Sequence, residues 1–329
     1  MKINALNLFC LVVIFLCLNR LSTQQTADLN DLLRREHSLI KPYGGSSAGI
    51  PFWDFVGSTI VSNKFVRLTA DSQSLQGALW NTIPVDFTDW EIQFQFHVHG
   101  HGKDLFGDGF AMWYTKERNV LGPVFGNKDH FTGLGIILDT YANYNGPNNR
   151  VHPYISAMIN NGSLGYDHEK DGINTALAGC ESMFRNKDYD TFLAVRYQNY
   201  KLTVSTDVDN KNQWKECLSV ENVKLPTRYY FGFSAATGDL SDNHDIISVK
   251  VYRLESPRKN EQIDHSLIEP SSASFPEQKE LVDAERPSTA WRVIKIMFIS
   301  VFVIGLVVGA LYVGYNIYDK QRRTKKRFY

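Results

Sequence analysis

The sequence predicts an all-β fold, an antiparallel two-sheet sandwich of the jelly-roll kind, followed by one C-terminal transmembrane helix. Short runs in which apolar and polar residues alternate have the period of half-buried strands. No long amphipathic helix pattern interrupts them between residues 24 and 254, so a second sheet has to cover the first. An uncharged apolar run, Met297 to Tyr318, is long enough to cross a bilayer.

The N-terminal residues predict a secretory signal peptide over 1–23. An apolar stretch from Ala5 to Leu18 is followed by small polar residues that offer a cleavage region. This stretch is too short to span about 30 Å of hydrocarbon as a stable anchor. The chain is therefore expected to enter the secretory pathway, with residues 24–254 as its lumenal domain.

Strand patterns fill that lumenal domain. The clearest strand alternates apolar with polar side chains, and its apolar members are Ile92, Phe94, Phe96 and Val98. Residues 192–197 and 201–206 flank a short connection and predict a hairpin. Residues 229–234 and 246–252 are further β-branched and aromatic runs, with turn-forming residues between them. Many short strands of this kind favour a sandwich.

The sequence beyond the domain predicts a flexible stalk, a membrane span and a cytoplasmic tail. Residues 255–290 are rich in Pro, Ser, Glu and Lys and have no sustained apolar period. The transmembrane helix with its flank covers 291–318, and the basic residues after it place the tail, 319–329, in the cytoplasm. Gly305 and Gly309 have a spacing that permits close helix contact, and with it a homo-oligomer.

The tail has no room for a folded domain, so we expect it to be a short sorting address read by vesicle coat components. The predicted signal is Lys325, Lys326, Arg327, Phe328 and Tyr329. Its basic residues favour retrieval, but Arg327 stands where such addresses place lysine, and arginine replaces a compact ammonium with a planar fork. Retrieval is then incomplete, and a single-pass type I protein spread over the endoplasmic reticulum, the ER-Golgi intermediate compartment and the Golgi is expected.

Cysteine content and charge agree with a lumenal domain. Cys10 and Cys17 lie in the predicted signal peptide, which leaves Cys180 and Cys217 for one disulfide in an oxidising compartment. A sequon at Asn161 predicts an N-glycan. The 35 basic residues are balanced by 35 acidic ones, so charge gives no argument for nucleic-acid binding.

One apolar strand pattern, residues 133–138, runs straight into a polar loop. Asp139, the Tyr141 carbonyl and Asn143 stand at alternate positions there, and Asp171 offers a second carboxylate. A carboxylate, a backbone carbonyl and an amide oxygen are ligands that Ca²⁺ favours. Asp and Asn are also common in ordinary turns, so by spacing alone a loop without a metal remains an alternative.

Two motifs, GDGFAMWY at 107–114 and LDTYAN at 138–143, resemble the paired motifs of leguminous-type (L-type) lectins. Other segments are similar to the animal branch, which works in the early secretory pathway, and they lie at 51–59, 161–168, 229–234 and 238–247. The resemblance covers roughly residues 37–252 and the tail. It implies a concanavalin-like sandwich and a calcium-dependent lectin for high-mannose N-glycans of secretory glycoproteins, acting as a cargo receptor or quality-control lectin in ER-Golgi transport.

The resemblance also implies individual roles. The implied calcium ligands are Asp139, Tyr141, Asn143 and Asp171. The implied carbohydrate contacts are Ser74, Asp108, Asn143, His168, Gly238, Asp239 and Leu240. These roles are chemically coherent, because a sugar hydroxyl both donates and accepts, so that a carboxylate can accept and backbone amides of a glycine turn can donate.

Two other functions compete with the lectin. A glycan hydrolase needs two carboxylates flanking the scissile bond, but Gln93 and Gln95 stand where a catalytic strand of this fold would carry acids, so we expect no enzyme. A cell-surface carbohydrate-binding adhesion receptor remains an alternative.

Three histidines, His97, His99 and His101, alternate along the strand that contains Phe94 and Phe96. Neighbouring side chains on one strand face stand about 7 Å apart, so we interpret the three as polar-face residues and not as a zinc site.

Overall fold

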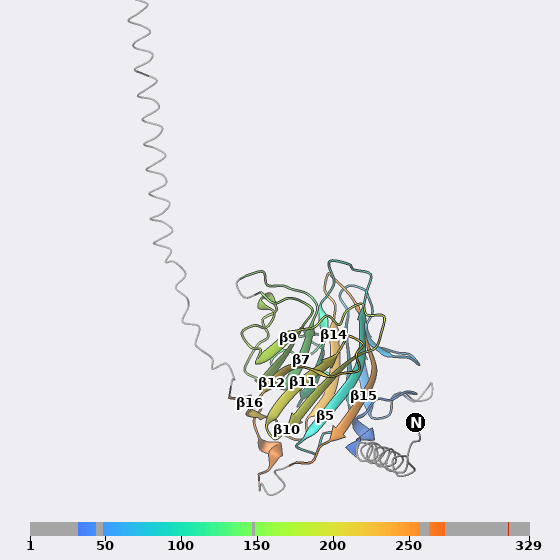
Figure 1. Ribbon diagram of the computed structural model, residues 1–329, viewed down its shortest axis with the longest axis vertical. Helices are drawn as coiled ribbons and strands as arrows, with labels where there is room; N and C mark the ends of the chain where they lie inside the picture. The colour runs from blue at the N-terminus through green and yellow to red at the C-terminus, as the bar shows by residue number, and fades with distance from the viewer. Residues whose placement is uncertain (1–31, 44–48, 147–148, 257–262, 274–314, 316–329) are drawn as a thin grey trace, which may run out of the picture. The chain divides into compact units, whose positions relative to one another are not determined.

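The computed structural model describes residues 32–43, 49–146, 149–256, 263–273 and 315. Apart from Tyr315, these belong to one compact unit. Two seven-stranded antiparallel sheets pack face to face in it, and a two-stranded sheet lies beside them (Figure 1). The predicted all-β sandwich is confirmed.

The first sheet has the strand order β1-β4-β14-β6-β7-β8-β9. Its strands are β1 Trp53–Gly57, β4 Gln76–Asn81, β14 Tyr230–Ala236, β6 Gly109–Thr115, β7 Thr132–Asp139, β8 Tyr154–Asn161 and β9 Ala178–Glu181. The second sheet has the order β12-β11-β10-β5-β15-β3-β2. Its strands are β12 Lys215–Val220, β11 Lys201–Asp207, β10 Thr191–Gln198, β5 Trp90–His99, β15 Asn243–Arg253, β3 Val66–Thr69 and β2 Ile60–Val61.

The remaining elements are short. They are the strands β13 Val223–Lys224 and β16 Ser271–Ser272, and the 3-10 helices η1 Arg35–His37, η2 His168–Lys170 and η3 His265–Leu267.

Strand β5 shows why the two sheets pack. Its buried and partly exposed residues alternate without a break, and Phe94 and Phe96 point into the core. The Phe94 ring lies 5.0 Å from that of Phe233 in the opposite sheet, with the edge-to-face geometry that aromatic pairs prefer. The predicted alternation is confirmed, and so is the hairpin, since β10 pairs with β11 through a turn at Asn199 and Tyr200.

Strands β6 and β7 differ from this pattern because both of their faces are buried. On the outer face, Trp113 of β6 packs against Phe131, with ring centroids 4.9 Å apart. Ile137 of β7 and Phe125 join the same apolar cluster. Strand β7 is therefore covered on both faces up to its last residue, Asp139.

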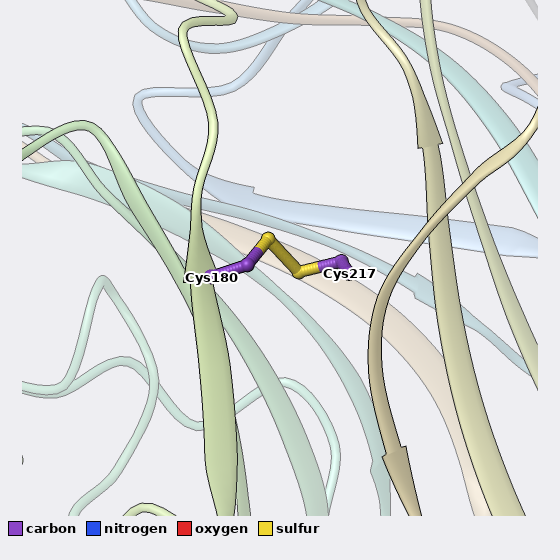
Figure 2. The surroundings of a disulfide bond; sticks show 2 residues. All are labelled: Cys180 and Cys217. Carbon is purple, nitrogen blue, oxygen red and sulfur yellow. A yellow bond between two sulfur atoms is a disulfide. The ribbon is translucent and has the colours of Figure 1, made fainter.

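A disulfide joins Cys180 of β9 to Cys217 of β12 and so links the two sheets (Figure 2). The predicted pairing is confirmed.

Replacing both cysteines by alanine is expected to lower the free energy of unfolding by about 3–4 kcal/mol, because the bridge closes a loop with a sequence separation of 37 residues. Urea denaturation of the oxidised wild type and the double variant measures the difference. Reduced wild type is the control and should match the variant. Equal midpoints for the oxidised wild type and the variant would contradict the loop-entropy argument.

Residues 263–273 differ from the expected flexible stalk. Asp264 caps η3 by accepting a hydrogen bond from the Ser266 amide at 2.9 Å, and β16 pairs with β13. The Asn161 side-chain amide also donates to the Glu269 carboxylate at 2.7 Å. The partner of β16 is a two-residue strand about 48 positions earlier, and no apolar period within the stalk sequence signals such a pairing.

Within the described residues, no helix is long and apolar enough to cross a membrane. The predicted signal peptide, transmembrane segment and tail lie outside the described residues, except for Tyr315.

Candidate functional site

The site begins where β7 ends. Gly109 at the start of β6 pairs with Asp139 at the end of β7. The loop before β6 and the loop after β7 therefore lie at the same end of these two strands. The Asp139 carboxylate is buried and accepts a hydrogen bond from the Tyr141 amide at 3.1 Å. This bond turns the chain directly after the strand and places the predicted ligand loop over the carboxylate.

Asp171 brings in a second loop. It follows η2 in the left-handed conformation, with φ of 50°, and its carboxylate is buried. Its two oxygens accept hydrogen bonds from the amides of Asn143 and Tyr144, at 2.9 and 3.1 Å. The structure therefore brings Asp139, Tyr141, Asn143 and Asp171 into one network.

A third side chain, His152, completes the cluster. Its Nε2 atom lies 3.7 Å from Asp139 Oδ2 and 4.0 Å from Asp171 Oδ2. Nε2 is buried, and it makes no hydrogen bond within the described part of the chain. Burial on its own would lower the pKa of His152, but the two carboxylates outweigh burial and raise the pKa. Sequence reasoning missed His152, because no local spacing links it to Asp139.

The two carboxylates of this cluster, together with the carbonyl and amide oxygens of the loop that follows β7, fit a hard cation. One ligand atom from each of Asp139, His152 and Asp171 lies within 4.8 Å of the others. Burial raises the pKa of Asp139, and the neighbouring Asp171 carboxylate raises it further, although His152 and the Tyr141 amide act against both. Two buried carboxylates need a compensating charge, and carboxylate, amide and carbonyl oxygens are what Ca²⁺ prefers.

Asp108 lies beside this cluster. The Gly107–Asp108 peptide bond is cis, and the Asp108 carbonyl accepts a hydrogen bond from the Thr140 amide at 3.0 Å. Partial burial, together with the negative charges of Asp139 and Asp239, raises the pKa of Asp108 to about 6. Its carboxylate is thus a partly buried acceptor group beside the loop cluster.

The turn Gly238–Leu240 packs against Asp108. A Cβ atom at Gly238 would stand 3.1 Å from Asp108 Oδ2, so only glycine leaves that oxygen uncrowded. The Ser74 amide donates to the Gly238 carbonyl at 3.1 Å, and Gln73 donates to the Asp239 carbonyl at 2.7 Å. The Gly238 turn therefore joins the loop of Ser74 to the loop of Asp108.

Tyr141 and Leu240 approach the same point from opposite loops. A Cβ atom at Gly107 would lie 3.2 Å from Tyr141 Cβ and 3.5 Å from Leu240 Cβ. The cation cluster and the Asp108 cluster are therefore continuous.

His168 belongs to the turn that carries Asp171, whose amide donates to the His168 carbonyl at 3.1 Å. Its Nε2 atom lies 3.0 Å from the Pro123 carbonyl oxygen. The ring also packs on Phe125 and Tyr166. Because a carbonyl oxygen only accepts, Nε2 carries the hydrogen in this contact, and Nδ1 is the acceptor of the neutral ring.

Residues 30–261 match the profile of the legume-like lectin family. The chain belongs to the legume-like lectin family. Its sequence is 52% identical to human vesicular integral-membrane protein VIP36 over 318 residues, which are 92% of this chain and 88% of the relative. The resemblance predicted from the two motifs is confirmed.

Solved structures agree. The crystal structure of the VIP36 exoplasmic/lumenal domain in its Ca²⁺/Man-bound form has a TM-score of 0.70 and 58% identity, and covers 73% of this legume-like lectin and 98% of that chain. The Ca²⁺/Man3GlcNAc-bound form has a TM-score of 0.69 and 57% identity, with 73% and 99% covered.

Proposed function

We propose that this chain is a calcium-dependent lectin that binds high-mannose N-glycans on secretory glycoproteins and acts as a cargo receptor or quality-control lectin between the endoplasmic reticulum and the Golgi. The observation that carries the proposal is the buried pair of Asp139 and Asp171 directly beside Asp108 and the Gly238 turn. A cation cluster adjoining an acceptor carboxylate and a glycine turn is suited to binding a polyol.

The residues that would hold calcium are Asp139, Asp171, the Tyr141 carbonyl and Asn143. When bound, calcium supplies positive charge against the two buried carboxylates and a preference for oxygen ligands. Asp171 already accepts from the amides of two loop residues, so the loop that carries Asn143 depends on this carboxylate for its position. VIP36, whose lumenal domain is 58% identical, has been crystallised with Ca²⁺ and mannose.

The sugar would be recognised by groups that differ in hydrogen-bonding role. Asp108 accepts from hydroxyls, while His168 Nδ1 offers a second acceptor because Nε2 is engaged with Pro123. The backbone amides of the turn at Asp239 and Leu240 would donate, and the Ser74 hydroxyl would do either. The Tyr141 ring offers an apolar face to a pyranose. Asn143 contributes to both the calcium and the sugar.

A glycan array with the full-length chain tests this function. Binding to high-mannose N-glycans in calcium and its loss in excess chelator are expected, with complex-type glycans as the matched control. Equal binding in calcium and chelator, or no preference for mannose-terminated glycans, would refute the proposal.

The transport role extends to the tail, in which Lys325–Tyr329 would be read by coat components. Replacing Arg327 by Lys should shift the chain toward the endoplasmic reticulum, because a pocket shaped for an ammonium favours lysine. Replacing Phe328 and Tyr329 by alanine should slow exit. Imaging and surface biotinylation measure both, and wild-type distribution in both variants, with strong surface labelling, would favour the adhesion receptor.

A further inference from the structure

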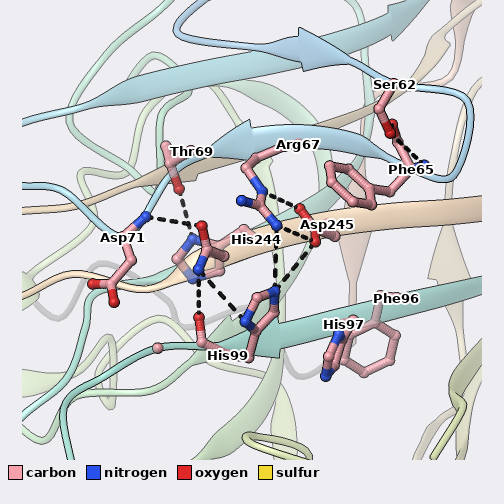
Figure 3. Close-up of polar contacts among 12 residues, drawn as sticks. Ser62, Phe65, Arg67, Thr69, Asp71, Phe96, His97, His99, His244 and Asp245 are labelled. Carbon is pink, nitrogen blue, oxygen red and sulfur yellow. Dashed lines mark hydrogen bonds and ion pairs between the residues drawn. The ribbon is translucent and has the colours of Figure 1, made fainter.

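A second cluster of metal-ligating side chains lies on the outer face of the second sheet, at a place the lectin function does not use. His97 and His99 project from β5, and Asp245 of β15 pairs with His97 across the strands (Figure 3). One ligand atom from each of the three lies within 4.8 Å of the others. We propose that His97, His99 and Asp245 form a zinc-binding site.

The geometry differs from the spacing expected for a strand face. Neighbours on one face stand about 7 Å apart on average. The rings of His97 and His99 instead stack, with centroids 4.4 Å apart and planes 24° apart. His101 does not join them, because its side chain is 99% exposed and bonds to Asp71 at 2.7 Å. Two of the three histidines are therefore brought together.

The hydrogen bonds of His97 select its free nitrogen. Nε2 lies 2.9 Å from the Lys187 carbonyl oxygen, which only accepts, so Nε2 is the donor and Nδ1 keeps its lone pair. Metal-binding imidazoles commonly donate their other N–H to a carbonyl or carboxylate in this way. His97 is thus held in a tautomer that can bind a metal ion.

His99 and Asp245 already have suitable spacing. His99 Nε2 lies 3.4 Å from Asp245 Oδ2, close to the edge of about 3.3 Å in a tetrahedron with bonds of 2.0–2.1 Å. The Asn243 side-chain amide donates to the His99 carbonyl at 3.2 Å. It lies 3.5 Å from His99 Nδ1, at the limit for a hydrogen bond, so it does not fix which ring nitrogen of His99 carries the hydrogen.

Arg67 sets the strength of the site. Its guanidinium donates to both oxygens of Asp245, at 2.7 and 2.8 Å, and stands 3.4 Å from His99 Nε2. These bonds orient the buried carboxylate, whose remaining lone pairs stay available, but the positive charge opposes a cation. Two imidazoles and one carboxylate suit Zn²⁺ and not Ca²⁺, and water would fill the fourth position.

Calorimetric titration of zinc into the detergent-solubilised full-length chain, saturated with calcium, tests the site. One zinc ion per chain is expected. His97→Asn and His99→Asn should each weaken zinc binding by about tenfold or more. His101→Asn, two residues beyond the end of β5 and outside the cluster, should stay within about twofold of wild type. Retained glycan binding in all three variants verifies that they are folded.

Arg67→Gln provides a change in the opposite direction, because removing the guanidinium removes repulsion. Zinc affinity should rise about fivefold or more, a gain that impaired folding does not produce. Cobalt substituted for zinc should show the visible absorption of a tetrahedral site in wild type and lose it in His97→Asn. Wild-type zinc affinity in the His97 and His99 variants, equal loss in His101→Asn, or no gain in Arg67→Gln would each overturn the proposal.

Discussion

Asp139→Asn is expected to abolish glycan binding and to leave the sandwich folded. The amide keeps the shape of the side chain and can still accept the 3.1 Å hydrogen bond from the Tyr141 amide. It removes one of the two buried charges that a calcium ion would compensate, and a single carboxylate holds the ion much more weakly. Calorimetry with calcium and then with a mannose oligosaccharide should detect neither binding event.

Thermal unfolding separates this effect from damage to the fold. Wild type should gain about 2.7 kcal/mol of stability at calcium concentrations of 100 times the dissociation constant, and Asp139→Asn should gain none. In chelator the variant should be at least as stable as wild type. A neutral amide avoids the free-energy cost of burying a charge, the same cost that raises the pKa of Asp139. Asp54→Asn, at an exposed position of β1, is the matched control and should bind normally. Wild-type glycan affinity in Asp139→Asn would remove calcium from the mechanism.

The parts of the fold that could be predicted are those with a local period. Strand β5 alternates strictly because only one face is buried, and its alternation is visible in the sequence. Strands β6 and β7 have no such alternation, because their outer faces are also covered, so β7 is visible in the sequence only as a continuous apolar run. The pairing of β16 with β13 has no local pattern at all.

The site divides in the same way. Asp139 and Asn143 lie within one six-residue motif, so the motif that identifies the family also identifies them. His152 is brought to Asp139 by the fold of the intervening loop, and its role is visible only once Asp171 is in place. His99 and Asp245 are separated by 146 positions and meet only because β5 and β15 are neighbours. Long-range pairing of this kind follows from topology and not from spacing.

Asp108→Asn is expected to weaken mannose binding by about 100-fold or more, while calcium binding changes far less. Hydrogen bonds to a charged group contribute about 1.5–3 kcal/mol each, and a carboxylate that accepts from two sugar hydroxyls contributes twice that. The amide keeps one acceptor oxygen and presents an N–H₂ group to the second hydroxyl. Calorimetry in saturating calcium measures the loss, and a separate calcium titration shows that the cation cluster is intact.

Asp239→Asn is the matched control, because it removes an equal charge from the adjacent turn. The Asp239 carbonyl is held by Gln73 at 2.7 Å, so the turn and its donor amides should be unchanged. Affinity within about threefold of wild type is expected, since the role of the turn belongs to its backbone. The lost Asp239 charge should also bring the Asp108 pKa down from about 6, which keeps that carboxylate ionised. If the two variants lose affinity equally, the turn binds through its side chain, and Asp108 is not the principal acceptor of the sugar.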